Sequence, residues 1–236
     1  MTDMKLDVRV YPIDEPKGST VAFASVGVED LVAIRGIRVV DSEKGLFVAM
    51  PQSKDKDSNY HDIAFPVTAD LRKAINSSVL DEFERVSVIS PDERGYDTPD
   101  KSAANSINAG DVKFDVRVFM IDEPQGSTKA FASVGVEDLV AIRGIRVVDG
   151  EKGLFVTMPQ SKDKDGGYHD VAFPLTGDLR REFCKAVLDV YEGSDRAVDR
   201  KHSLGDKLAE GAEKAAAYVA QPRAAVAKSH GAGVLE

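Results

Sequence analysis

A direct repeat with a constant offset of 108 residues limits what this chain can fold into. Residues 6–71 align with residues 114–179 without a gap, and the two stretches differ at 12 of 66 positions. Sequences this similar share one fold, and a copy of about 80 residues is a whole domain rather than a solenoid unit. We therefore expect two domains of the same architecture, residues 5–86 and 113–192.

The segments outside the repeats differ from them in composition. Residues 87–112 are rich in Ser, Asp, Pro, Gly and Asn, which predicts a flexible linker. A flexible chain of this length spans about 28 Å, so the domains should meet at an effective concentration on the order of millimolar. Residues 193–236 are Ala-rich with a thin apolar stripe, which predicts a partly helical, frayed tail.

Five segments of each repeat have the pattern of β-strands. Leu6, Val8 and Val10 alternate with charged residues, as in a strand with one buried face. The fifth segment ends at Pro66, which a sheet accepts only at a strand end or edge. In the first repeat the second to fifth segments read TVAFASVGVED, LVAIRGIRVVD, GLFVAMP and YHDIAFP.

A helical period follows the last strand of each repeat. Apolar residues then recur every fourth position, at Leu71, Ile75, Val79 and Phe83 and at Leu179, Phe183, Val187 and Tyr191. Thr68 and Thr176 precede these segments and suit the N-cap position. The predicted fold class is α+β: two copies of a small antiparallel sheet of about five strands, each followed by a C-terminal helix.

The charge of the chain argues against a strongly basic nucleic-acid binder. Its net charge is −9, and each repeat carries 11 basic and 14 acidic residues. Proteins that bind nucleic acid usually present a basic surface that neutralises phosphates. The whole chain has no such excess, so any binding must come from local groups of cations.

Neither a membrane segment nor a disulfide is expected. The chain has no run of about 18 apolar residues and does not begin with a basic stretch followed by an apolar core. We expect no membrane association and a cytoplasmic location. The single cysteine, Cys184, has no partner and no neighbours at metal-ligand spacing, so we expect it to be buried in a helix.

The charged stretch PQSKDKDSNY does not have the spacing of a metal site. Asp55, Asp57 and Asn59 occupy positions 1, 3 and 5 of a possible calcium loop. Tyr60 replaces the glycine needed at position 6, and Pro66 replaces the glutamate needed at position 12. We expect a hairpin turn here and no metal.

Hydrolytic chemistry is not expected either. Ser53, His61 and Asp62 resemble the parts of a catalytic triad, but His61 and Asp62 are neighbours on a predicted strand and point to opposite faces. The scattered glycines match neither a Walker loop nor a dinucleotide fingerprint. We therefore expect no enzymatic activity and no cofactor.

One long stretch of each repeat resembles a known family. The run IRGIRVVDSEKGLFVAMPQSKDKDSNYHDIAFPV, followed by LRKAINSSVLDEFERV, is similar to the stage V sporulation protein G (SpoVG) family. The resemblance implies a small α+β domain that dimerises through its sheet, and a non-catalytic regulator of septation and sporulation that binds DNA or RNA. Tandem fusion would make that dimer internal, an intramolecular pseudo-dimer that could also form larger homo-oligomers.

The candidate nucleic-acid contacts are cations near the helix starts and in the hairpin loops. Free backbone amides and the helix dipole favour phosphate at a helix N-terminus. The first-rank candidates are Arg72, Lys73, Arg180, Arg181, Lys54, Lys56, Lys162 and Lys164.

The second-rank candidates are strand arginines: Arg35, Arg38, Arg143 and Arg146. They lie three residues apart in each repeat, so on a regular strand they would face opposite sides. Asp55 and Asp163 precede the loop lysines and weaken phosphate attraction. The alternative is therefore a protein-interaction module that keeps the fold and has lost nucleic-acid binding.

Overall fold

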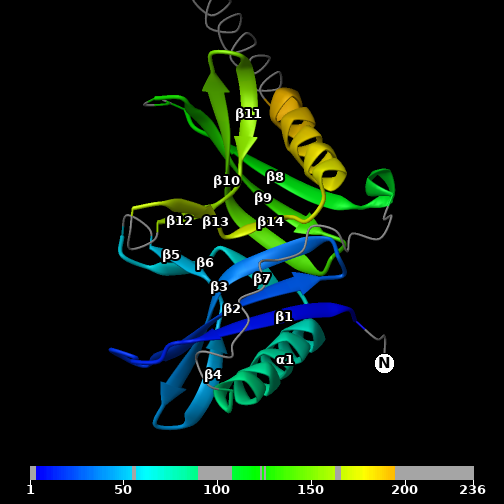
Figure 1. The fold of residues 1–236 in the computed structure, drawn as a ribbon. Helices are drawn as coiled ribbons and strands as arrows, with labels where there is room; N and C mark the ends of the chain where they lie inside the picture. The colour runs from blue at the N-terminus through cyan, green and yellow to red at the C-terminus, as the bar shows by residue number, and fades with distance from the viewer. Residues whose placement is uncertain are drawn as a thin grey trace, which may run out of the picture. The chain divides into compact units, whose positions relative to one another are not determined.

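The computed structural model describes residues 4–54, 57–89, 108–122, 124, 126–162 and 166–194 (Figure 1). The predicted tail helix and most of the predicted linker lie outside these residues. Across the described ranges, no helix is both long and apolar enough to cross a membrane.

In the described residues, each repeat forms seven strands and one long helix. The first contains β1 (Leu6–Pro12), β2 (Thr20–Val28), β3 (Val32–Ser42), β4 (Gly45–Ala49), β5 (Gln52–Lys54), β6 (Tyr60–Asp62), β7 (Ala64–Pro66) and α1 (Ala69–Ser87). After the short 3-10 helix η2 (Ala109–Asp111), the second contains β8 (Phe114–Met120), β9 (Thr128–Val136), β10 (Val140–Gly150), β11 (Gly153–Thr157), β12 (Gln160–Lys162), β13 (Tyr168–Asp170), β14 (Ala172–Pro174) and a helix over residues 177–194.

The two repeats exchange one strand each. The first large sheet has the order β1-β2-β3-β14, with β4 also paired to β3, and the second has β11-β10-β9-β8, with β7 paired to β10. Ala172 of the second repeat lies opposite Ile34 of the first, and Ala64 lies opposite Ile142. All these pairs are antiparallel. The expected α+β fold and internal pseudo-dimer are confirmed, and the fifth strand of each sheet comes from the other repeat.

The sequence pattern predicted one strand for the segment YHDIAFP, but the structure has two. It divides at Ile63 into β6, which pairs with β5 in a small hairpin, and β7, which joins the other repeat. Ile63 donates its backbone N–H to the carbonyl of Pro51 at 2.8 Å and is buried. Its own carbonyl accepts the backbone N–H of Arg143 at 2.7 Å. The chain therefore turns at the buried Ile63, leaving the β5–β6 hairpin and entering the large sheet of the other repeat.

The helices cover one face of each sheet. Leu71, Ile75 and Val79 of α1 are fully buried, as predicted from their spacing. Thr68 caps α1 by accepting the N–H of Leu71 at 3.2 Å, and Thr176 accepts that of Leu179 at 3.1 Å. Buried side chains of both repeats form one continuous apolar cluster. Because that cluster spans both repeats, we expect them to unfold together.

A β-bulge in β10 changes which residues share a face. The pairing of β10 with β9 shifts by one residue between Ile142 and Ile145, and both isoleucines are fully buried. Gly144, between them, has φ +75°, a conformation that glycine adopts without steric cost. The extra residue lets Arg143 and Arg146 line one hollow, so the expectation of opposite faces is wrong.

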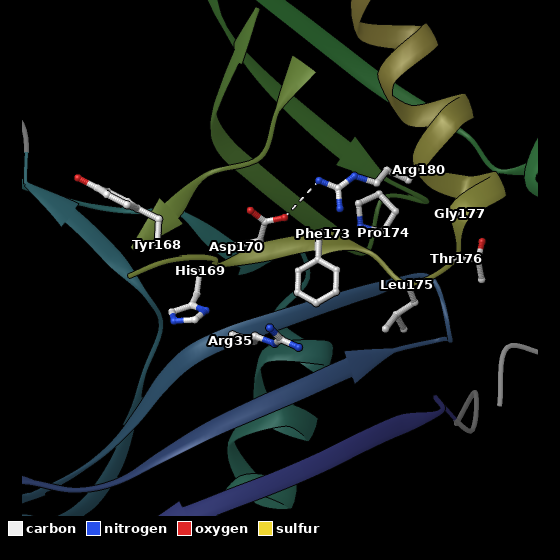
Figure 2. Close-up of a pocket in the computed structure, with 10 residues that line it drawn as sticks. All are labelled: Arg35, Tyr168, His169, Asp170, Phe173, Pro174, Leu175, Thr176, Gly177 and Arg180. Carbon is white, nitrogen blue, oxygen red and sulfur yellow. Dashed lines mark hydrogen bonds and ion pairs between the residues drawn. The ribbon is translucent and has the colours of Figure 1, made fainter. Parts of the chain in front are cut away.

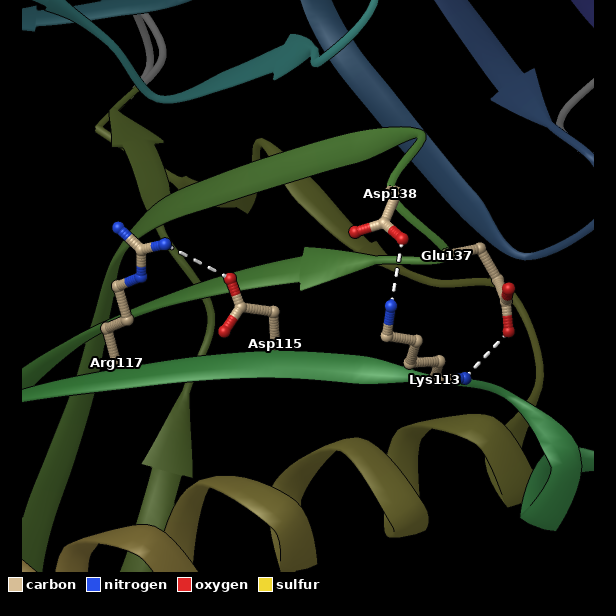
Figure 3. A network of polar contacts seen from close by, with 5 residues as sticks. All are labelled: Lys113, Asp115, Arg117, Glu137 and Asp138. Carbon is tan, nitrogen blue, oxygen red and sulfur yellow. Dashed lines mark hydrogen bonds and ion pairs between the residues drawn. The ribbon is translucent and has the colours of Figure 1, made fainter.

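A tight turn joins β9 to β10. Glu137 and Asp138 both have positive φ, and Leu139 donates its N–H to the carbonyl of Val136 at 2.9 Å. Lys113 donates its backbone N–H to Glu137 Oε1 at 2.7 Å and its Nζ to Asp138 at 2.9 Å (Figure 3). The hydrogen bond to Asp138 raises the pKa of Lys113 because it favours the charged ammonium. These contacts fasten the turn to the start of β8.

Candidate nucleic-acid interface

Two hollows lie where the repeats meet. The first has a volume of about 500 Å³ and is lined by Arg35 of the first repeat and by residues of β13, β14 and the start of the second helix (Figure 2). Arg180 is on the opposite wall from Arg35. The fold thus gathers one second-rank and one first-rank candidate from different repeats.

Each repeat places an arginine over an aromatic ring of the other. The Arg35 guanidinium lies 4.7 Å from the centre of the Phe173 ring, and Arg35 donates its backbone N–H to Val171 at 2.7 Å. Arg143 lies over Phe65 at the same distance. A guanidinium over a ring face keeps its N–H groups in its own plane, where they can bind a carboxylate or a phosphate at its edge.

The arginines at the helix starts already have acidic partners. Arg180 donates to Asp170 Oδ2 at 3.2 Å, and Gln160 Nε2 donates to the other oxygen of Asp170 at 3.0 Å. Arg72 is 3.8 Å from Asp62 in the first repeat. These pairs are partly exposed, so they contribute at most about 1 kcal/mol each. A phosphate at either arginine would have to compete with the carboxylate.

The neighbouring helix cations differ between the repeats. Arg181 forms an ion pair with Asp178, three residues before it. Lys73 occupies the equivalent place in the first repeat, is exposed, and pairs with no acid in the part of the chain that the structure describes. Of these two positions, Lys73 is the one available to an incoming anion.

The hairpin lysines lie beside tyrosines. Lys54 Nζ is 5.8 Å from the centre of the Tyr60 ring, and Lys162 Nζ is 5.8 Å from that of Tyr168. Both tyrosines are 65% exposed. Lys56 and Lys164 lie outside the described residues. Each described hairpin therefore offers a cation and an aromatic surface together.

A second hollow, of about 470 Å³, combines arginines with aromatic rings. Arg143 and Arg146 line it together with Phe131, Tyr168 and His61. The site residues predicted from the sequence are all cations, and these aromatic residues are not among them. Phe131 occupies an outward position of β9, between buried Ala130 and Ala132, so its place in the alternation could have revealed it.

Among the described residues, the histidines and carboxylates near this hollow do not form a metal-binding group. His61 is exposed on β6, whereas the next residue, Asp62, accepts a hydrogen bond from Gln52 at 2.9 Å. Within the described ranges, no three His, Cys, Asp or Glu side chains are grouped to hold a metal ion. Cys184 is half-buried in the second helix, and burial raises the pKa of its thiol, partly offset by the charge of Arg180.

The repeats correspond to a known family. The family model SpoVG matches residues 4–85 and again residues 112–193. This chain belongs to the SpoVG family. A protein of Staphylococcus epidermidis strain RP62A named "Putative septation protein SpoVG" is 36% identical over 92 residues, which cover 39% of this chain and 89% of that relative. SpoVG of Staphylococcus aureus strain JH9 is 36% identical over the same length, covering 91% of the relative. A whole relative thus corresponds to one SpoVG repeat of this chain.

Proposed function

We propose that this tandem SpoVG protein is a non-enzymatic cytoplasmic regulator, linked to septation and sporulation, that binds DNA or RNA. The observation that carries the proposal is the first hollow, which is lined by Arg35 of one repeat and Arg180 of the other. Arginine binds phosphate through a planar fork of N–H donors. Two arginines from different repeats in one hollow can hold neighbouring phosphates of one strand.

The local charges explain how an acidic protein could bind a polyanion. Arg35 and Arg143 lie over aromatic rings and form no ion pair with an acid in the described ranges, so their charge is available. Arg72 and Arg180 are paired with Asp62 and Asp170. Binding should therefore be weak or selective and should fall steeply with salt, because each phosphate contact releases counterions.

A protein-interaction module is the second candidate. It is favoured by the 11 basic and 14 acidic residues of each repeat, and by the acidic partner that each helix-start arginine already has. In this case the hollows would accept side chains of another protein, and phosphates would be repelled by the surrounding acids.

A salt titration separates the two candidates. Binding of labelled single- and double-stranded DNA and RNA is measured between about 50 and 200 mM salt, where phosphate contacts give a large loss of affinity. Absence of binding at the lower salt favours the protein-interaction module. Measurable binding with a steep salt slope favours the nucleic-acid regulator.

Charge reversal tests the location of the site. Replacing Arg72, Lys73, Arg180 and Arg181 by Glu should abolish binding. The matched control reverses four other exposed cations, Lys17, Lys44, Lys152 and Lys185, and changes the net charge by the same amount. Equal losses in the two variants, or none in the first, would reject the helix starts as the site.

A further inference from the structure

The outer face of each large sheet carries a row of aromatic side chains that ends in an arginine. In the first repeat Tyr11 lies opposite Phe23, and Phe23 lies opposite Arg38 on the next strand. In the second repeat the same positions hold Phe119, Phe131 and Arg146. We refer to these two sets of three residues as the aromatic rows.

The aromatic rows face away from the helices. Their neighbours along β2, Ala22 and Ala24, are buried against the core, so Phe23 between them points to the other side of the sheet. Phe23 is 45% exposed and Phe131 is 46% exposed. A single exposed phenylalanine is common on protein surfaces, but here each one lies opposite a second aromatic ring on the neighbouring strand, and contiguous exposed apolar surface of this kind marks an interaction site.

Each row carries an arginine that has no acidic partner among the described residues. Arg9 and Arg117 pair with the aspartates two residues before them, as Figure 3 shows for Arg117 and Asp115. Arg38 and Arg146, by contrast, form no ion pair with any residue that the structure describes. A cation at the end of two aromatic rings fits an anionic ligand that has flat faces.

The second row is continuous with a hollow at the repeat junction. Phe131 and Arg146 line the hollow of about 470 Å³ together with Arg143 and Tyr168. A chain lying across the row would therefore pass directly to a further arginine and a further aromatic ring. This continuity favours an extended ligand over a compact one.

We propose that the aromatic rows are stacking platforms for the bases of single-stranded nucleic acid. The proposal deepens, and rests on, the proposed nucleic-acid function, because it names the form of nucleic acid and the surface that reads its bases. Directly opposite side chains on neighbouring strands are about 4.5–5.5 Å apart, so two adjacent bases can each stack on one ring. Sheets with exposed aromatics on neighbouring strands bind unpaired RNA bases in this manner, and stacking tolerates any base sequence.

Duplex nucleic acid does not fit this surface. Its bases are stacked on one another and present only their edges in the grooves, so a flat aromatic row cannot reach a base face. An unpaired strand can turn its bases onto the rings while its phosphates meet Arg38 or Arg146. The rows therefore predict a preference for single strands.

The absence of tryptophan from the chain allows a direct test on the full-length protein. Phe23→Trp and Phe131→Trp each introduce a single fluorophore into one row. The probes are a single strand of about 12 thymidines, within the site size of a sheet domain, and an abasic strand of the same length. We expect quenching of either tryptophan by the thymidine strand and little by the abasic strand, which has phosphates but no bases to stack.

Removing the rings of Phe23 and Phe131 should weaken binding by the free energy that base stacking contributes. The variant with Phe23→Leu and Phe131→Leu keeps apolar side chains of similar size, and its affinity for the thymidine strand should fall at least about fivefold for each ring. Its affinity for the abasic strand should not change. The control Val190→Ala removes an exposed apolar side chain on the second helix and should bind as the parent does.

The outcomes distinguish the two proposals. If the parent binds the thymidine and abasic strands equally, or if the double Leu variant binds as well as the parent, the stacking platform is wrong while phosphate binding stands. If the parent binds no strand even at low salt, both proposals fail. Preferential binding of a duplex of the same length would also overturn the platform. Urea unfolding of each variant establishes that a loss of binding is not a loss of fold.

Discussion

Arg35 and Arg143 each contact the other repeat through both the side chain and the backbone. Each lies over a phenylalanine ring of the other repeat at 4.7 Å. Each also donates its backbone N–H to a carbonyl of the other repeat, that of Val171 for Arg35 and that of Ile63 for Arg143. The side chain therefore has two tasks, since the stacked guanidinium stabilises the junction and presents its N–H groups to the hollow. Substitution should affect stability and ligand binding separately.

Replacing both stacked arginines by methionine should lower the free energy of unfolding by about 0.5–1 kcal/mol for each arginine. Methionine retains most of the apolar contact with the ring but removes the charge. The measurement is urea unfolding, with Lys73→Met as the control because Lys73 is exposed. An unchanged midpoint would show that the stacking contributes nothing to the junction.

Cys184 provides a residue-scale prediction about pH. Burial raises the pKa of its thiol, and only the thiolate reacts with alkylating reagents. Alkylation by iodoacetamide should therefore be slower in the folded protein than in urea at neutral pH, and should accelerate only at a higher pH than it does in urea. Similar rates in the folded and unfolded protein would mean that the thiol is accessible and its pKa ordinary.

At the scale of elements, the strands and helices were predictable where their period was regular. The helix from Ala69 has the predicted cap and buried positions because Thr68 and a four-residue apolar spacing act locally. The division of YHDIAFP at Ile63 was not predictable, because it depends on burial of Ile63 and on pairing with another repeat. The bulge at Gly144 was missed because it depends on how β10 pairs with β9, which strict alternation along one strand does not reveal, and with it the common face of Arg143 and Arg146 was missed.

The bulge can be tested by contrasting two glycines of the second repeat. Gly144→Ala forces an L-residue to φ +75° and should cost about 1–2 kcal/mol of stability. Gly177→Ala introduces the alanine that the first repeat has at position 69, in open space, and should be neutral or stabilise by about 0.5 kcal/mol. Thermal unfolding of both variants checks this. Equal effects would mean that the positive φ at Gly144 imposes no constraint.

At the scale of the whole molecule, the reciprocal exchange of β7 and β14 explains why the repeats must act together. Neither large sheet has its full set of strands without the other repeat, and the buried side chains of both form one cluster. The near-identity of the repeats predicted a common fold and a pairing, but repeats of one sequence could equally pair side by side without exchange. The pairing of β7 with β10 and of β14 with β3 distinguishes these arrangements.

The exchange predicts how the protein should respond to cleavage between its repeats. Cleavage at a protease site placed within residues 87–112 would give two halves that each lend a strand to the other, so they should stay associated under native conditions and separate only in denaturant.

The tether holds the two halves at an effective concentration on the order of 1 mM. Its loss at about 1 µM protein should therefore lower stability by about 4 kcal/mol. The urea midpoint should rise with concentration in the cleaved sample and stay constant in the uncut one. Two folded halves that separate on size exclusion without denaturant would contradict strand exchange, because each would then have a complete sheet of its own.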